Sequence, residues 1–202
     1  MAIAFDTSSK SSGKTFAHTC TGSNLVLLVY TNTYTEHASA VTYNGVSLTN
    51  IISQYGNDYM DVWILVNPST GTNNIVITTT SPLDLYYGLS YSGCYQISQP
   101  DSSGTTNGSM NSGLLVSTTV VSTNCWLVGF SNSTYTITTN ATNRQNGTSG
   151  QYNYSSVICD TNNTVGTGSQ GITFTSTPGI GRGIVLSLSP APDANGDFFE
   201  FF

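Results

Sequence analysis

Short apolar or alternating runs recur about every 10–15 residues, and clusters of Gly, Asn, Ser and Pro separate them. This spacing is typical of the strands of a sandwich or barrel. The pattern predicts strands over residues 2–6, 15–20, 24–31, 40–43, 46–50, 59–66, 74–80, 86–97, 112–122, 125–131, 135–139, 151–159, 171–176 and 182–189. We therefore expect an all-β, antiparallel β-sandwich of the jelly-roll or immunoglobulin-like kind.

Two of these runs, residues 24–30 and 125–130, are apolar at consecutive positions. A strand of this kind has both faces buried, so we expect these two to be central strands, with Trp63 and Trp126 as core anchors. Asn44-Gly45 between alternating runs predicts a type I′ hairpin, because Asn and Gly accept its positive φ angles. Asn67-Pro68 predicts a second turn.

The composition supports strands over helices. Charged residues make up 7% of the 202 residues, and the chain contains 31 Thr, 28 Ser and 19 Asn. Thr, Val, Ile and Tyr favour pleated surfaces, whereas helices favour the Glu, Lys and Arg that are scarce here. The net charge of −6 argues against nucleic acid as a partner, and no run is long enough to insert into a membrane.

The pattern predicts one sandwich domain over residues 1–189 and a tail over residues 190–202. It shows no convincing internal repeat. Stretches 99–112, 140–150 and 160–170 hold little to bury, so we expect surface loops there. The tail starts with a stiff Pro-Ala-Pro spacer, continues through a turn, and ends in Phe198, Phe199, Glu200, Phe201 and Phe202.

The four cysteines, Cys20, Cys94, Cys125 and Cys159, have no zinc-binding spacing. An even number allows two disulfides in any of three connectivities. Each lies in or beside an apolar strand, which favours buried free thiols.

No motif for catalysis or cofactor binding has the required spacing. Gly13-Lys14-Thr15 lacks the first glycine of a phosphate loop and precedes a strand rather than a helix. Residues 179–183 resemble a dinucleotide loop only in their glycines. Residues 193–197 carry alternating oxygen ligands, but the glycine is misplaced for a calcium loop. We expect no cofactor and no metal.

His18 and His37 are the only histidines, and neither belongs to a nucleophile motif. Asp58 and Asp61 are close in sequence, and a lone pair of exposed carboxylates of this kind usually belongs to a solvated turn. We therefore predict that the chain is not an enzyme.

The Phe-rich end, residues 198–202, is the most distinctive feature of the sequence. It could fold back as a last strand of its own sandwich, or it could add to the edge of a neighbouring subunit, with its rings filling pockets. We favour the second interpretation, with Phe198, Phe199, Phe201 and Phe202 as partner-binding residues.

Several phrases together resemble a family of sandwich modules found in phage virion proteins and in surface proteins of uncultivated bacteria. They are residues 2–9, 16–24, 41–46, 66–76, 90–93 and 126–129. The four cysteines and the Phe-rich end depart from the family's pattern. The resemblance implies a jelly-roll or immunoglobulin-like module that is displayed on a surface, and it implies no active-site residues.

The expected function is that of a structural protein on a virion surface, as a capsid decoration protein or fibre-type subunit that assembles through its tail with itself or other subunits. One alternative is an extracellular carbohydrate-binding or adhesive module, in which Tyr86, Tyr87, Tyr91 and Tyr95 stack on glycans, although cross-strand packing explains these tyrosines as well. Another is a strand-exchanging extracellular filament subunit.

Overall fold

The computed structural model describes residues 1–56, 58–82, 85–149 and 153–192. The regular secondary structure among these residues consists of β-strands alone, and every pairing between strands is antiparallel. The predicted all-β, antiparallel sandwich is therefore confirmed. The described part of the chain has no helix that could cross a membrane.

The first half of the chain (residues 1–98) and the second half (residues 99–192) each build two sheets. The strands of the first half are β1 (Ala4–Ser11), β2 (Thr15–Cys20), β3 (Val26–Thr33), β4 (Ala40–Tyr43), β5 (Val46–Ser47), β6 (Thr49–Tyr55), β7 (Tyr59–Val66), β8 (Gly71–Thr78) and β9 (Leu85–Ser92). Those of the second half are β10 (Ser102–Ser109), β11 (Leu114–Val120), β12 (Trp126–Ser133), β13 (Thr138–Thr139), β14 (Thr142–Thr148), β15 (Ser155–Asp160), β16 (Gly168–Thr175) and β17 (Ile180–Leu188).

The two halves have the same strand order, except that the described residues of the second half form no counterpart of β5. The first forms sheets β1-β9-β3-β7-β6 and β2-β8-β4-β5, and the second forms β10-β17-β12-β15-β14 and β11-β16-β13. The order β1-β9-β3-β7 opposite β2-β8-β4-β5 is that of an eight-stranded jelly roll, to which β6 adds an edge strand. The expectation of no internal repeat was therefore wrong at the level of topology. The repeat is not evident in the sequence, because the two halves have equivalent turn and core positions but few identical residues.

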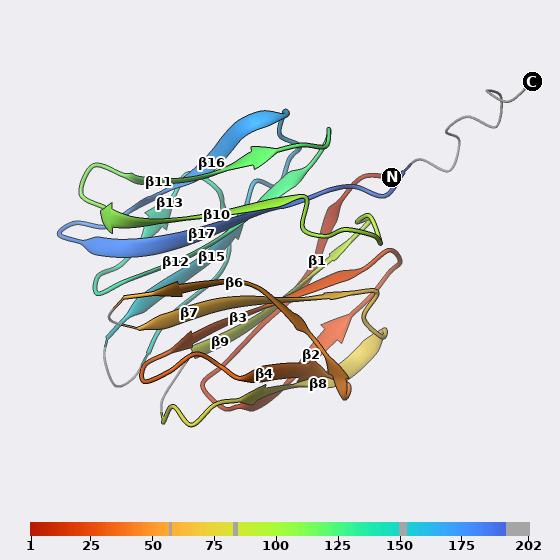
Figure 1. The fold of residues 1–202 in the computed structure, drawn as a ribbon, viewed down its shortest axis with the longest axis horizontal. Coiled ribbons are helices and arrows are strands. Elements are labelled where there is room, and N and C mark those ends of the chain that lie inside the picture. Colours follow the sequence, from red (N-terminus) through yellow and green to blue (C-terminus); the bar gives the residue numbers. More distant parts are fainter. Residues whose placement is uncertain (57, 83–84, 150–152, 193–202) are drawn as a thin grey trace, which may run out of the picture.

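The four sheets stack as four layers (Figure 1), with β11, β13 and β16 at the top of the view and β2, β4 and β8 at the bottom. The two five-stranded sheets face each other in the middle, and their side chains form the largest core, which we call the central core. A smaller core lies within each half, between its own two sheets. Both five-stranded sheets thus have two buried faces.

This layering explains the two continuous apolar runs. In β3 and the residue before it, Leu25, Leu27 and Val29 point into the core of the first half, whereas Val26 and Leu28 point into the central core. All eight residues of β3 and all eight of β12 are buried. The prediction of two central strands is confirmed, and so are the core anchors Trp63 and Trp126, which are 7% and 8% exposed.

Two predicted loops are strands instead. Residues 102–109, inside the predicted loop 99–112, form β10, which pairs with β17 along its whole length. Residues 142–148, inside the predicted loop 140–150, form β14, which pairs with β15. Both are edge strands without large apolar residues, so their backbone pairing leaves no apolar pattern in the sequence.

The predicted turns are confirmed. Asn44 and Gly45 both have positive φ angles between β4 and β5, as a type I′ hairpin requires. Asn67, with φ of 56°, reverses the chain between β7 and β8.

Candidate functional site

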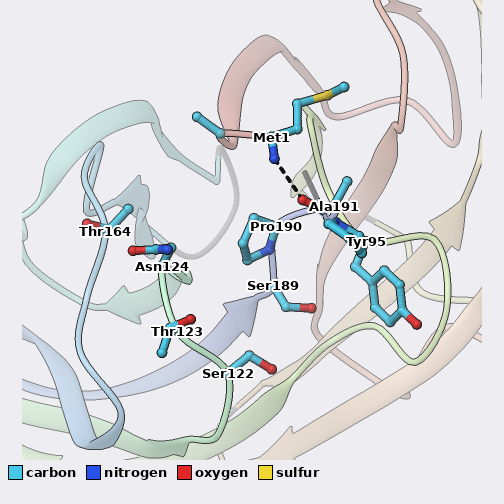
Figure 2. Close-up of a pocket in the computed structure, with 11 residues that line it drawn as sticks. Met1, Tyr95, Ser122, Thr123, Asn124, Thr164, Ser189, Pro190 and Ala191 are labelled. Carbon is cyan, nitrogen blue, oxygen red and sulfur yellow. Dashed lines mark hydrogen bonds between the residues drawn. The ribbon is translucent and has the colours of Figure 1, made fainter. Parts of the chain in front are cut away.

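A pocket of about 600 Å³ lies where the two halves meet, beside the last described residues (Figure 2). We call it the seam pocket. Its lining comes from the start of the chain, from the segment after β9, from the β11–β12 and β15–β16 loops, and from the segment after β17. These residues are Met1, Ala2, Tyr95, Ser122, Thr123, Asn124, Thr164, Ser189, Pro190, Ala191 and Pro192.

Backbone pairing fixes the floor of the seam pocket. Cys94 and Pro190 form an isolated antiparallel bridge, and the N–H of Ala191 donates to the carbonyl oxygen of Gly93 at 2.8 Å. The N–H of Tyr95 donates to the carbonyl oxygen of Ser189 at 2.9 Å. Residues 190–192 are predicted as a stiff extended spacer, and Pro190 and Ala191 pair with the segment that follows β9. The residues that immediately follow β9 and β17 pair with each other across the two halves.

A hydrogen-bond network around Asp101 holds one wall in place. The Asp101 carboxylate accepts hydrogen bonds from the N–H groups of Val121 and Ser122 and from the Ser122 hydroxyl, at 2.8, 3.1 and 2.6 Å. Burial raises the pKa of Asp101, but these donors outweigh it and the net pKa is lowered. The carboxylate therefore stays ionised at neutral pH and orders the loop before Asn124.

The lining is apolar or neutral. Its described residues include no carboxylate, imidazole or thiol side chain, and the one charged group among them, the Met1 ammonium, donates to the Ala191 carbonyl oxygen at 2.9 Å. Figure 2 shows the Pro190 ring between Asn124 and Thr164 on one side and Tyr95 on the other. Such a lining can pack against aromatic rings and hydrogen-bond to a peptide backbone.

The predicted partner-binding residues, Phe198, Phe199, Phe201 and Phe202, lie outside the described residues. The alternative site made of tyrosines is not supported by the burial of its members. Tyr86, Tyr87 and Tyr91 are fully buried, and only Tyr95 reaches a pocket. Their cross-strand packing in the interior is confirmed, and a glycan cannot stack on them.

His18 is buried in a polar network of the first half. Its Nδ1 lies 2.8 Å from the Ser9 hydroxyl, and its Nε2 lies 3.1 Å from the Ser90 hydroxyl, which donates to Asp6. Burial lowers the pKa of His18 to about 4, although Asp6 opposes the shift. The imidazole is therefore neutral at pH 7. The carboxylate contacts the serine rather than the imidazole, so the group does not have the order of a catalytic triad.

His37 and Asp61 form a second pair, with Nδ1 and Oδ1 at 2.6 Å. The Ser53 hydroxyl donates to this same oxygen at 2.6 Å, so the serine is bound to the carboxylate and not to the imidazole. Asp58 and Asp61, expected in a solvated turn, are instead buried at 1% and 0% exposure. The expectation was wrong because Asp61 lies within β7 and is paired with His37 and Ser53 of its own half, whereas Asp58 is covered by Asn132 and Arg182 of the second half.

The remaining sequence motifs are explained by the fold. Lys14 donates to the Thr79 carbonyl oxygen at 2.7 Å and leads into strand β2, and residues 179–183 lead into β17. All four cysteines are free and buried, as predicted. Among the described residues, no three His, Cys, Asp or Glu side chains lie close enough to hold a metal ion.

The sequence pattern does not reveal the seam pocket, because its walls come from five separate segments. A signal was nevertheless present in the repeat. Asn24 precedes β3 and Asn124 precedes β12, both with positive φ angles, and the strands end in Thr-Asn-Thr and Ser-Asn-Ser. Alignment of these segments would have indicated an internal repeat. Comparisons of the chain with protein-family models, with curated proteins and with solved structures find no match.

Proposed function

We propose that this chain is a non-enzymatic structural subunit displayed on a particle surface, most simply as a phage capsid decoration or fibre-type protein. In this proposal the Phe-rich segment, residues 198–202, binds the seam pocket of a neighbouring copy. The observation that carries it is the position of Pro192. This last described residue lines a pocket to which prolines, a tyrosine and a methionine contribute, and five residues separate it from Phe198, the first of four phenylalanines.

The length of the connecting segment supports a neighbouring copy as the source of the segment. Five residues span at most about 17 Å when extended, which is enough to leave the rim and reach an adjacent subunit. Burying three Phe rings contributes roughly 5–9 kcal/mol before the cost of ordering the chain, so one such contact can hold an assembly together. Leaving four Phe rings in water would favour aggregation.

The outer surface supports display. Strands β10 and β14 expose Ser, Thr and Asn on their solvent faces, β11 exposes Ser117 and Thr119 beside Leu115, and only 7% of the chain is charged. A surface of hydroxyls and amides stays hydrated without charge. Together with the resemblance to displayed modules, this favours a virion surface or extracellular location.

The test is the oligomeric state of the full chain, measured by light scattering, beside a variant that lacks residues 198–202 and the variant Thr123→Arg. We expect the full chain to form a closed oligomer and both variants to be monomeric, because the new arginine fills the seam pocket with charge. Thr119→Arg is the matched control, since Thr119 is an equally exposed threonine on β11 outside the pocket. It should assemble normally.

Other outcomes would contradict the proposal. If the full chain is monomeric at all concentrations, or if it assembles without residues 198–202, the segment is not the anchor. A monomer whose seam pocket is protected by residues 198–202 would mean that the segment folds back on its own chain. Long fibres of the pure protein would favour the filament alternative.

A further inference from the structure

A second pocket, of about 580 Å³, lies at the opposite end of the second half from the β11–β12 loop. We call it the tyrosine pocket. It lies between the end of β10, the end of β12 and the start of β17, and it is lined among others by Ser109, Asn111, Tyr135, Tyr154, Ile180 and Arg182. It shares no residue with the seam pocket.

The charge of this pocket is balanced within the protein. The Arg182 guanidinium donates to Asp58 Oδ1, and the amide of Asn132 donates to Asp58 Oδ2. Both charged side chains are well buried, at 13% and 2% exposure. Since Asp58 comes from the first half, this pair also locks the pocket floor to the facing sheet. Among the residues that the structure describes, the lining has no other charged side chain, so these residues present no net charge to a ligand.

The rim combines apolar and polar groups. Tyr135 and Ile180 are 49% and 75% exposed, although both are large and hydrophobic. Exposed Ser109, Asn111 and Thr134 surround them with hydroxyl and amide groups, which both donate and accept hydrogen bonds. An aromatic face beside such groups matches a ligand that has C–H faces and hydroxyl edges.

We propose that the tyrosine pocket binds a neutral saccharide. A sugar ring packs on Tyr135, and its hydroxyls pair with the amides and hydroxyls of the rim. An anionic sugar or a phosphate gains little binding free energy from its charge, because Asp58 already neutralises Arg182. A divalent cation finds no carboxylate in the lining. The inference does not depend on the seam pocket or on the oligomeric state.

The test is binding of the full chain to an array of neutral oligosaccharides of two to six units, with uronic-acid oligosaccharides on the same array. Hits are then titrated by calorimetry against three proteins: the wild type, Tyr135→Ala and Tyr55→Ala. Tyr55 is the matched control, because it is 64% exposed and lies outside the pocket. We expect binding to at least one neutral oligosaccharide, a loss of at least tenfold in affinity for Tyr135→Ala, and no change for Tyr55→Ala.

The proposal is overturned by the absence of binding across the array at millimolar oligosaccharide. It is also overturned if Tyr135→Ala binds as well as the wild type, since the site would then lie elsewhere. Tighter binding to uronic-acid oligosaccharides would refute the argument from charge balance. Circular dichroism of each variant separates a lost contact from a lost fold.

Discussion

The two halves share a strand order, but at one pair of equivalent positions the glycine lies on a different strand. It lies on β9 in the first half and on β12 in the second. In the first half Val29 of β3 pairs with Gly88 of β9, whereas in the second half Gly129 of β12 pairs with Val185 of β17. A Cβ on Gly88 would lie 3.1 Å from His18 Nδ1 and 2.7 Å from Ile75 Cδ1. Gly88 therefore makes room for the buried imidazole.

In the second half the same space is used for an aromatic ring. A Cβ on Gly129 would lie 2.9 Å from the Phe174 ring, and one on Gly183 would lie 3.3 Å from it. Phe174 is the seventh residue of β16, where β8 has Ile77, and Gly183 pairs with Ser131 as Tyr86 pairs with Thr31. The core of the first half thus has its large residues on the central strands β3 and β9. The core of the second half has a large residue on β16, in its outer sheet. The comparison teaches that backbone order is retained while volume is redistributed.

The halves also differ where they meet. Tyr30 of β3 stacks on Phe130 of β12, with ring centroids 5.3 Å apart, so equivalent strands supply equivalent rings. The ion pairs are not equivalent. Arg182 reaches across to Asp58, whereas Arg144 pairs with Asp160 of its own half and lies over the Phe5 ring of the other. Tyr91 donates to Asp160 at 3.0 Å and completes that contact.

The largest effect is expected for Arg182→Leu, which copies the first half, since Leu85 pairs with Asn32 as Arg182 pairs with Asn132. Removing one partner leaves Asp58 charged and buried, so we expect a loss of about 3–5 kcal/mol in the free energy of unfolding at pH 7. Urea denaturation measures it.

The loss in the free energy of unfolding should shrink towards pH 4. Burial raises the pKa of Asp58, so its carboxyl group takes up a proton more readily as the pH falls, and the neutral carboxyl no longer needs a charged partner. The double variant Asp58→Asn/Arg182→Leu should recover most of the stability. If the single and double variants are equally destabilised, the damage is a packing defect and the ion pair does not hold the halves together.

Gly129→Val is the next largest change, because it gives β12 the residue that β3 has. The valine would overlap Phe174 and Ile172, and we expect a loss of about 3 kcal/mol in the free energy of unfolding. Adding Phe174→Ile, which copies Ile77, should restore part of this loss. A double-mutant cycle by urea denaturation tests it, and purely additive effects would mean that the two positions do not exchange volume.

His18→Thr gives the smallest effect, and one that depends on pH. His18 pairs with Asn73, and at the same place in the second half Thr118 pairs with Gln170. Because the pKa of His18 is lowered to about 4 in the folded protein, the unfolded chain takes up the proton first. This histidine should therefore lower stability as the pH falls from about 6.5 towards 4, by about 2 kcal/mol between pH 7 and pH 5.

The measurement compares the wild type with His18→Thr in urea at pH 7 and at pH 5. The variant should lose about 2 kcal/mol less than the wild type over this interval. Equal losses would show that His18 is not the group that makes the first half sensitive to acid.

The sequence by itself determined the fold class, the two central strands, the hairpin at Asn44-Gly45 and the buried thiols. Each follows from local chemistry, namely apolar periodicity, turn residues with positive φ angles, and the preference of free cysteine for the interior. It did not determine the edge strands β10 and β14, whose pairing uses the backbone and leaves no apolar pattern.

Only the tertiary structure decided that the sandwich is two jelly rolls stacked face to face. The apolar runs of β3 and β12 predict two buried faces but not which layer covers each face. Asp58 and Arg182 come from segments far apart in the chain, as do the residues that line each pocket, so both pockets exist only after the two halves pack together or the loops converge. Contacts of this kind depend on the register and stacking of whole sheets, which side-chain periodicity does not encode.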